Sequence, residues 1–475
     1  MRVVGLVIAV TLFSVHFAFT AEPVDVGDRA QLFVDGLFLE SSENVALRVV
    51  PPTKTDEQTL VPDKPWEDAS LNWFSVIEDN GKYRMWYECY DVPGWPTMDD
   101  TSFCYAESTD GIHWTKPALG LFPYGGSNET NILFRKIGDK GFNSRVHGTS
   151  VFVDPNAPAE ARYKAVSQGQ FETHEPPYRV AGMYSADGLR WTRYAKPICD
   201  IFADSQYSGF WDAAIGQYVL YGRVSGKGRS IGRSTSAALD QFEPLSLVLE
   251  LEPSTDLYNP AALKYPYADR VYFMFPSVYD HASDMLDIHL AVSRDGVHWT
   301  WPERGVPYIP RGDAGRFDSG SLYMGQGMVK TADGLSLYYN GSPLKHNEAE
   351  LENLTKPENK RIFSRVVTRE NRFVAVTASD TPGHFTTPPL QFAGNVLELN
   401  CATNDGGEIR VGLRDADGNA IPGFGVEDCE PIRGDEMHKR VTWKAGVELP
   451  ATTTSTIKLE IALRNARIFA FQFAK

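Results

Sequence analysis

Short apolar runs separated by turn-forming residues recur along most of the chain. Residues 73–77, 83–87, 103–105 and 217–221 are rich in aromatic and aliphatic side chains, and Gly, Pro, Asn or Asp lies between such runs. Runs of this length and composition predict β-strands rather than helices. The 40 Gly and 30 Pro residues fit a chain with many tight turns, so helix-dominated folds and coiled coils are poor candidates.

One eight-residue pattern is repeated among these predicted strands. The pattern Ser-x-Asp-Gly-x-x-Trp-Thr begins at Ser108, Ser185 and Ser293, and degenerate copies begin at Ser234 and Thr368. Asp-Gly supplies the positive φ angles of a tight hairpin turn, and the Trp ring packs against the sheet. We therefore assign the aspartates of the pattern to the turn and exclude them from catalysis. They are Asp110, Asp187 and Asp295.

The repeat predicts the architecture. Each copy follows an apolar run that opens a new unit, so a unit holds about four strands in roughly 60 residues, as a propeller blade does. We predict an all-β fold, with a five-bladed β-propeller over residues 67–381 and a small C-terminal β-sandwich over residues 386–475. Residues 22–66 are expected to form an extended segment that packs on the propeller. Gly-rich turns are expected at residues 405–407 and 417–419 of the sandwich.

The amino terminus resembles an export signal. Arg2 precedes an apolar run over residues 3–19, and polar sequence resumes at Glu22. We predict a signal peptide over residues 1–21 and a secreted or periplasmic protein. An uncleaved anchor is the alternative, because 17 apolar residues lie near the lower limit for a membrane span. No other window is apolar enough to span.

Charge and cysteine content exclude some classes of partner. The 61 acidic and 46 basic residues give a net charge of −15, which disfavours nucleic acid as a partner. We predict a carbohydrate partner and no membrane contact beyond the signal segment. The five cysteines show no zinc-binding spacing. Cys89 with Cys104, and Cys401 with Cys429, either form disulfides or are buried as small apolar residues.

Candidate catalytic residues come from the segments that precede each opening strand, because propellers bind ligands at their axis. Asp68, Asp204, Asp256 and Asp318 occupy such segments in four of the five units. Cleavage of a glycosidic bond needs one protonated and one ionised carboxyl group, and crowded carboxylates separate their pKa values. We predict that these four aspartates are catalytic. For any one of them, the alternative is a cap or turn residue.

Candidate substrate-binding residues lie near the same segments. Trp66 and Trp95, in Pro-flanked loops, are suited to stacking on sugar faces, whereas Trp73 lies within a predicted strand and is assigned to the core. The other candidates are Arg145, His147, Tyr207 and Tyr258. A basic cluster of Arg223, Lys227, Arg229 and Arg233 either orients an anionic sugar or forms a solvated loop. His174, His281, His289 and His346 show no metal-ligand spacing. A structural calcium near the axis is compatible with the sequence, but no motif demands one, and we predict no cofactor.

Several stretches resemble known proteins. Residues 104–117 (CYAESTDGIHWTKP), 155–158 (PNAP), 203–206 (ADSQ) and 421–429 (IPGFGVEDC) are similar to the five-bladed propeller glycoside hydrolases of families 32, 43, 62 and 68. The protein most resembles secreted bacterial family-32-like proteins with a C-terminal β-sandwich. The resemblance implies an exported glycoside hydrolase that acts on a plant, algal or microbial polysaccharide or oligosaccharide.

The catalytic motifs of these families are only partly present. The Trp-Met-Asn-Asp-Pro and Arg-Asp-Pro segments of family 32 are absent, and Glu88 lies on the first blade, so the acid role of that family is not transferred to it. By the family-43 pattern, Asp68 matches the base and Asp204 a later carboxylate, whereas His147 occupies the second blade. Two alternatives stay open. One is a noncatalytic carbohydrate-binding or surface-scaffold propeller, and the other is a sialidase-like hydrolase with an arginine triad, for which only Arg145 is well placed.

Overall fold

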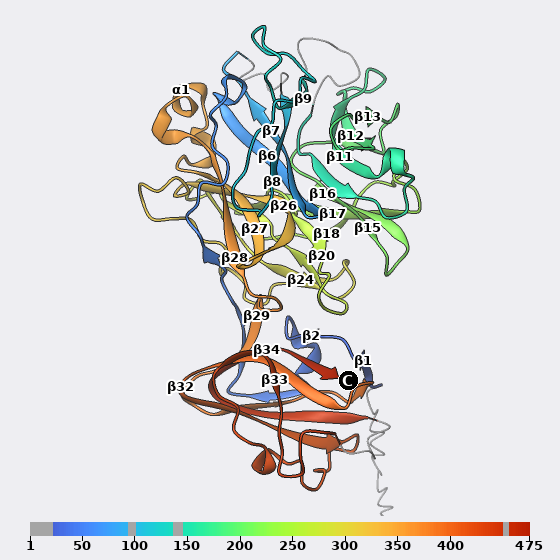
Figure 1. Ribbon diagram of the computed structural model, residues 1–475, viewed down its shortest axis with the longest axis vertical. Helices are drawn as coiled ribbons and strands as arrows, with labels where there is room; N and C mark the ends of the chain where they lie inside the picture. Colours follow the sequence, from blue (N-terminus) through green and yellow to red (C-terminus); the bar gives the residue numbers. More distant parts are fainter. Residues whose placement is uncertain (1–21, 94–100, 136–145, 450–455) are drawn as a thin grey trace, which may run out of the picture.

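The computed structural model describes residues 22–93, 101–135, 146–449 and 456–475. Within these residues the regular structure is almost entirely β-strand, with a single short α-helix, α1 (Leu351–Leu354). The all-β prediction is confirmed. Figure 1 shows two bodies, one above the other, and strand β29 (Val374–Ala378) leads from the upper to the lower. None of the described helices is long and apolar enough to cross a membrane. The predicted signal peptide lies outside the described residues, so export stays a prediction.

The upper body is built from five antiparallel sheets, which we number in chain order. Sheet 1 holds β6 (Ser70–Asp79), β7 (Lys82–Tyr90), β8 (Ser102–Ser108) and β9 (Ile132–Arg135). Sheet 2 holds β10 (Ser150–Val153), β11 (Tyr163–Gln170), β12 (Tyr178–Ser185) and β13 (Thr192–Arg193), and β14 (Cys199–Phe202) also pairs with β12. Sheet 3 holds β15 (Ser208–Asp212), β16 (Gln217–Ser225), β17 (Arg229–Ser236) and β18 (Ser246–Leu249).

The remaining two sheets follow the same order of strands. Sheet 4 holds β20 (Ala262–Lys264), β21 (Tyr272–Met274), β24 (Ala291–Ser293) and β25 (Trp299–Thr300). Sheet 5 holds β26 (Ser321–Thr331), β27 (Gly334–Ser342), β28 (Ile362–Thr368) and β5 (Thr53–Lys54). A smaller antiparallel set, β19 (Thr255–Leu257), β22 (Ser277–Asp280) and β23 (Met285–Ile288), lies beside β26. Two of the short 3-10 helices are η2 (Pro65–Glu67), before sheet 1, and η4 (His346–Glu348), between β27 and β28.

The first strands of the five sheets meet at one axis through polar side chains. Ser208 Oγ donates to Gln326 Oε1 at 2.6 Å, and Gln326 Nε2 donates to the Ala262 carbonyl at 2.9 Å. Gln206 Nε2 donates to the Thr149 carbonyl at 3.0 Å. Gln206 Nε2 also donates to the Phe74 carbonyl of sheet 1 at 2.9 Å, so residues on or just before the opening strands join the five sheets in a ring.

The predicted Asp-Gly turns attach sheets 1, 2 and 4 to the sheet before each of them. In sheet 2, Asp187 Oδ1 accepts from the amides of Leu189 and Arg190 at 2.8 Å each, which fixes the turn. The Gly188 carbonyl then accepts from Trp86 Nε1 of sheet 1 at 2.6 Å. Gly188 has φ +75°, and a Cβ atom there would lie 2.8 Å from the Trp86 ring. Only glycine fits both the backbone angle and the close approach.

Three other copies of the turn motif also contact the preceding sheet. The Gly111 carbonyl accepts from the Tyr338 hydroxyl of sheet 5, and the Gly296 carbonyl accepts from the Tyr221 hydroxyl of sheet 3, both at 2.6 Å. In the degenerate copy of sheet 5, the amide of Asn371 donates to the Tyr265 hydroxyl, beside sheet 4, at 3.0 Å. The motif is therefore an inter-sheet contact, and its aspartates are turn residues.

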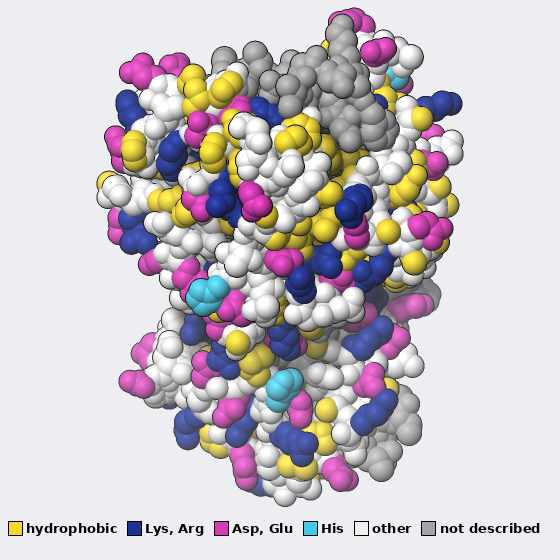
Figure 2. Space-filling model, turned by 45° about the horizontal axis from the view of Figure 1, so that its top comes forward, with side chains coloured by type: hydrophobic (Ala, Val, Ile, Leu, Met, Phe, Trp, Pro, Cys, Tyr) yellow, Lys and Arg dark blue, Asp and Glu magenta, His cyan; other side chains and the backbone are white. Residues whose placement is uncertain are grey.

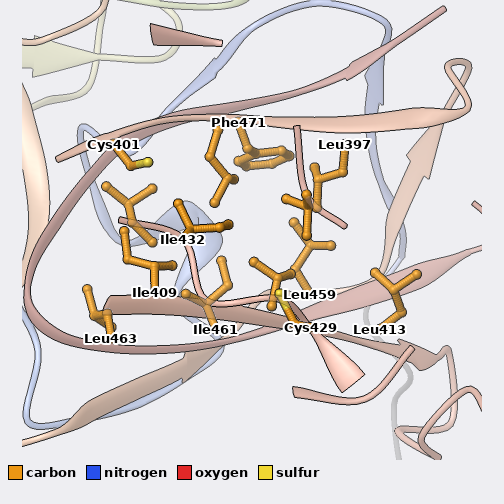
Figure 3. Packing of buried hydrophobic residues seen from close by; sticks show 14 of the residues in the cluster. Leu397, Cys401, Ile409, Leu413, Cys429, Ile432, Leu459, Ile461, Leu463 and Phe471 are labelled. Atoms are coloured by element: carbon orange, nitrogen blue, oxygen red, sulfur yellow. The ribbon is translucent and has the colours of Figure 1, made fainter. Parts of the chain in front are cut away.

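The lower body is one hydrogen-bonded network of strands that bends round a core (Figure 3). Its strands are β1 (Val24–Gly27), β2 (Gln31–Leu32), β3 (Ser41–Glu43), β4 (Ala46–Val49), β29, β30 (Gly383–Thr386), β31 (Leu390–Phe392), β32 (Val396–Asp415), β33 (Asp435–Arg440) and β34 (Ile457–Ala474). The Gly-rich turn predicted at residues 405–407 is wrong. The β32–β34 register shifts between Thr403 and Glu408, so these residues form a bulge within one long strand.

The amino-terminal segment differs from the prediction that residues 22–66 pack on the propeller. Strand β5 does pair with β28 of sheet 5, but β1 pairs with β31, β2 with β34, β3 with β30 and β4 with β29. Val26, Phe33 and Phe38 are buried in the lower core, which explains why this segment leaves the ring. Strand β29 also joins the lower body, although it lies before the predicted boundary.

The five cysteines are buried free thiols, so the burial alternative holds and the two predicted disulfides do not form. The sulfur atoms of Cys89 and Cys104 face each other at 3.6 Å. Cys401 and Cys429 lie apart in the lower core, with other apolar side chains around them (Figure 3). Figure 2 shows acidic and basic side chains interspersed over the described surface of one face, so the negative net charge is not gathered there.

Candidate active site in the axial pocket

A pocket of about 390 Å³ lies where the opening strands of the ring begin. It is lined by Trp73 on β6 of sheet 1, His147 before sheet 2, Asp204 before sheet 3, Tyr258 after β19, and Tyr323 on β26 of sheet 5. We call it the axial pocket. Residues far apart in the sequence meet here because the five sheets share one axis.

Asp204 is the carboxylate that lines this pocket. Its Oδ2 atom accepts from Arg223 Nη2 at 2.5 Å, and its Oδ1 atom lies 3.5 Å from His147 Nε2. Burial alone would raise the pKa of Asp204, but the hydrogen bond from His147 and the charge of Arg223 outweigh it and hold that pKa well below its usual range. Asp204 is therefore ionised at neutral pH while about 39% of its side chain stays exposed.

His147 connects Asp204 to a buried acid. On its other side, His147 Nδ1 lies 3.2 Å from the Tyr90 hydroxyl and 3.7 Å from Glu88 Oε2. Glu88 is completely buried, and the amides of Gly148 and Thr149 donate to its two oxygens at 3.2 and 2.8 Å. Burial raises the pKa of Glu88. The row Glu88–His147–Asp204 thus orients the imidazole toward the pocket.

The rings of Trp73, Tyr258 and Tyr323 line the pocket together, and we call them the aromatic wall. The rings of Trp73 and Tyr258 are stacked, with centroids 6.5 Å apart and an angle of 25° between the planes. His346 of η4 lies between two phenols, with Nε2 at 3.0 Å from the Tyr258 hydroxyl and Nδ1 at 2.7 Å from the Tyr323 hydroxyl. Burial, aided by the charges of Arg361 and Arg229, lowers the pKa of His346 to about 4, so its imidazole is neutral at neutral pH.

The structure does not gather all four predicted aspartates in the pocket. Asp256 lies behind the wall, where Arg229 Nη1 and His281 Nε2 approach its Oδ2 at 2.8 and 3.0 Å. Burial would raise the pKa of Asp256, but bonds from the Arg229 amide, His281 and the Arg229 guanidinium lower it overall. Asp256 therefore holds Arg229, whose guanidinium lies 5.2 Å from the centroid of the Tyr258 ring.

Asp318 and Asp68 have structural surroundings. Asp318 is completely buried, and its Oδ2 accepts from Lys54 Nζ on β5 at 2.7 Å and from the Tyr339 hydroxyl at 2.9 Å. It joins the amino-terminal strand to sheet 5 and does not line the pocket. Asp68 ends η2, and its Oδ1 accepts from the amide of Val92 at 2.7 Å. Asp68 fits the predicted alternative of a cap residue, and Asp318 lies in a turn, as the same alternative allows, with a buried ion pair to Lys54 in addition.

Two of the predicted sugar-stacking side chains are buried elsewhere. Trp66 is 5% exposed and its Nε1 donates to Asn131 Oδ1 at 3.0 Å, so it packs inside sheet 1 rather than facing a ligand. Tyr207 is 1% exposed and packs between sheets 2 and 3. Trp95 and Arg145 lie outside the described residues. Of the predicted binding residues, His147 and Tyr258 line the pocket.

Sequence reasoning missed Tyr90, Tyr323, His346 and Arg361, which line the pocket, whereas Trp73 is buried as predicted and also contributes to the lining. Trp73 and Tyr323 carry a usable signal, because each stands near the start of an opening strand.

The basic residues that the sequence groups into one cluster have different partners in the fold. Arg223 and Arg229 bond to Asp204 and Asp256, whereas Lys227, which is exposed, pairs with Glu250.

The opposite ends of the inner strands enclose a larger cavity of about 690 Å³. Its lining includes Phe210, Leu263 and Met328, and the Nζ of its Lys264 lies 2.7 Å from Asp212. Because the smaller axial pocket holds an ionised acid beside imidazoles and phenols, we place the candidate active site there. Among the described residues, no group of three or more His, Cys, Asp or Glu side chains is arranged to hold a metal ion.

No family model matches the chain. A curated relative, "Uncharacterized protein MT1551" of Mycobacterium tuberculosis (strain CDC 1551 / Oshkosh), is 29% identical over 156 residues, which cover 31% of this chain and 41% of the relative. The chain thus spans about two fifths of the length of that relative.

Solved structures of similar fold are glycoside hydrolases. A structure described as a glycoside hydrolase has a TM-score of 0.48 at 14% identity, over 67% of this protein and 92% of the other. A glycosyl hydrolase from Bacteroides ovatus has a TM-score of 0.46 at 14% identity, over 74% and 95% of the two proteins. A thermostable family-43 glycoside hydrolase has a TM-score of 0.44 at 14% identity, over 69% and 96%. Family 43 is one of the propeller families that the sequence resembles, and these likenesses concern the fold.

Proposed function

We propose that the protein is a glycoside hydrolase that cleaves a poly- or oligosaccharide in the axial pocket. The observation that carries the proposal is Asp204, an ionised carboxylate held by Arg223 and His147 at the wall of a pocket faced with aromatic rings. An ionised carboxylate serves as base or nucleophile in glycosidic cleavage. Stacked Trp and Tyr rings suit the apolar faces of sugars.

In this proposal Asp204 has the ionised role, and its partners are positioning residues. Arg223 and His147 fix both carboxylate oxygens, so Asp204 does not need to reorient when a sugar enters. Glu88 and Tyr90 hold the far side of the His147 ring, which keeps its Nε2 atom directed at Asp204.

A second candidate function is noncatalytic carbohydrate binding. The usual mechanism of glycosidic cleavage needs two carboxyl groups, and Asp204 is the one carboxylate among the described residues that line the pocket. This observation favours a binding protein that uses the same aromatic wall. Release of sugar from a substrate separates the two functions.

The test is release of reducing sugar from a panel of plant, algal and microbial glycans. We expect the wild-type protein to cleave at least one glycan and Asp204→Asn to cleave it about 10² to 10⁴ times more slowly, because the ionised group is lost. Asp256→Asn is the matched control, since this carboxylate lies behind the wall. It is expected to keep most of the activity.

Two outcomes would contradict the proposal. If Asp204→Asn cleaves as fast as the wild-type protein, Asp204 is not the catalytic carboxylate. If no glycan is cleaved but glycans bind with micromolar to millimolar affinity, the noncatalytic function replaces the hydrolase.

A further inference from the structure

Arg361 is a cation of the axial pocket that has no carboxylate partner among the residues the structure describes. It precedes β28 and lines the pocket with part of its side chain exposed. Its Nε atom is buried and has no hydrogen-bond partner, and the described residues offer it no ion pair. Its guanidinium lies 5.2 Å from the centroid of the Tyr323 ring, which holds it in place.

Two other arginines near the pocket are paired with carboxylates, and the carboxylate of Asp284 accepts hydrogen bonds from the neutral groups of Tyr279 and Asn347. Arg223 bonds to Asp204 at 2.5 Å, and Arg229 bonds to Asp256 at 2.8 Å. Asp284, which lies near His346, accepts from the Tyr279 hydroxyl at 2.9 Å. The positive charge of Arg361 therefore has no partner within the described pocket. A partly buried guanidinium is well suited to a planar or tetrahedral anion, which it can bind with two parallel N–H bonds.

The neutral imidazole of His346 leaves one of the two neighbouring phenols free to donate a hydrogen bond to a ligand. A neutral imidazole has one N–H donor and one acceptor nitrogen. Since its two nitrogens face the hydroxyls of Tyr258 and Tyr323, it donates to one phenol and accepts from the other. The phenol that accepts from the imidazole keeps its own proton for a ligand. Arg361 and this phenol together make a site that donates hydrogen bonds to an anion.

We infer that the axial pocket selects acidic sugars and that Arg361 binds their charged group, a carboxylate or a sulfate ester. The inference rests on the proposed carbohydrate function and specifies the class of sugar. A neutral sugar would leave the guanidinium of Arg361 desolvated without a counter-charge, which costs free energy, whereas an acidic sugar removes that cost.

The experiment measures binding of monosaccharides by titration calorimetry at low salt. The probes are galacturonate, galactose 6-sulfate and neutral galactose. We expect the two acidic sugars to bind at least about tenfold more tightly than galactose, and the preference to fall as NaCl is added. The better of the two acidic probes identifies the charged group as carboxylate or sulfate.

Variants assign the preference to Arg361. Arg361→Gln is expected to bind all three sugars with similar affinity, and Arg361→Lys to keep part of the preference, because it retains the charge but not the planar fork. Arg190→Gln is the control, since Arg190 is exposed in the turn motif and bonds to Asp187. It is expected to keep the full preference.

The inference is wrong if wild-type protein binds galactose as tightly as the acidic sugars, or if Arg361→Gln keeps the preference in a folded protein. These outcomes are separate from the fate of the proposed function. A preference for acidic sugars without glycan cleavage supports the inference and the noncatalytic alternative. Cleavage of a neutral glycan without the preference supports the hydrolase and overturns the inference.

Discussion

The turn motifs and the axial segments are both repeated once per sheet, yet they behave differently. In the turns, the same residue types make the same contact in sheets 1, 2 and 4, where the glycine carbonyl accepts from a Tyr or Trp of the preceding sheet. At the axis, equivalent segments hold a helix end at Asp68, a pocket imidazole at His147 and a pocket acid at Asp204. The last two segments hold Asp256, which bonds to Arg229, and the buried Asp318.

This difference shows how a repeated fold separates assembly from chemistry. A contact that every sheet needs must be repeated, so it leaves a pattern in the sequence. A binding site at the axis is used once, and each sheet supplies a different part of it. Repetition therefore identifies the residues that assemble the ring, and departures from repetition identify the residues that act on a ligand.

The largest expected effect concerns Asp318, an axial aspartate that serves assembly. Lys54→Met leaves its buried carboxylate without the cation that lies 2.7 Å away. We expect the free energy of unfolding to fall by about 3 to 5 kcal/mol in urea denaturation, because the nearest cation left to the buried carboxylate is Arg316, whose Nε lies 4.0 Å from Oδ1. Adding Asp318→Asn to this variant is expected to restore part of the loss.

The control for that variant is an ion pair on the ring surface. Lys227 lies 3.0 Å from Glu250, and 52% of the Lys227 side chain is exposed. Lys227→Met is expected to cost much less stability than Lys54→Met, because water screens an exposed ion pair. Equal losses in the two variants would show that Asp318 does not depend on Lys54 and would weaken the distinction between assembly and chemistry at the axis.

The next effect tests the turn motif itself. Gly188→Ala places a Cβ atom 2.8 Å from the Trp86 ring at a residue with φ +75°. We expect unfolding to become easier by about 2 to 4 kcal/mol, from backbone strain and overpacking together. Gly216→Ala is the matched control, since Gly216 has φ +64° and no atom within 4 Å of the added Cβ.

For Gly216→Ala we expect a loss of about 1 to 2 kcal/mol, which is the strain alone. Thermal and urea denaturation of both variants measure the difference. If the two losses agree, the close contact with Trp86 contributes nothing, and the motif is only a turn rather than an inter-sheet contact.

The smallest expected effect is a difference in pH dependence. The turn motif and the axial pocket change the free energy of unfolding in different pH ranges. The pKa of Asp187, which burial would raise, is lowered overall by the amides of Arg190 and Leu189, so its contribution is lost as pH falls below the ordinary value of 3.8. The pKa of His346 is lowered from 6.5 to about 4. Its folded form binds fewer protons than the unfolded chain between those values, so the free energy of unfolding increases with pH there.

Urea denaturation between pH 2.5 and 7 measures both regions. Asp187→Asn is expected to reduce the loss of stability below about pH 4 and to leave the upper range unchanged. His346→Gln is expected to flatten part of the rise between about pH 4 and 6.5. His289, whose pKa burial also lowers to about 4, adds to that rise, whereas Glu88, whose pKa burial raises, opposes it. An unchanged slope in His346→Gln would contradict the neutral imidazole of the pocket.

The sequence predicted the all-β fold and the turns because these depend on local spacing. Asp-Gly followed by Trp specifies a turn whatever lies elsewhere in the chain. It also predicted His147, Asp204 and Tyr258 at the axis, since a position before an opening strand is a local property. Burial is not local. Trp66 lies in a Pro-flanked loop by sequence, but its indole bonds to Asn131 inside sheet 1.

The remaining site residues depend on contacts between distant segments. Nothing near Arg361 in the sequence shows that its guanidinium lacks a carboxylate, because that depends on which acids the other sheets place beside it. His346 lacks metal-ligand spacing, and its role comes from Tyr258 and Tyr323 of other strands. Asp318 and Asp204 both precede an opening strand. Their roles differ because β5 of the amino-terminal segment brings Lys54 to Asp318.

The pairing of the amino-terminal strands has a consequence for the order in which the protein is completed during synthesis. Strands β1 to β5 are made first, but their partners are β28 to β31 and β34, near the end of the chain. Sheets 1 to 4 each lie within one stretch of the chain and can form as they emerge, whereas β5 has no partner strand until β28 of sheet 5 is made, late in synthesis. Until then the apolar segment with Val26, Phe33 and Phe38 has no core to enter. The nascent polypeptide therefore exposes an apolar amino-terminal segment that can aggregate. We expect a stalled or truncated product to need a chaperone, whereas the finished protein does not need one.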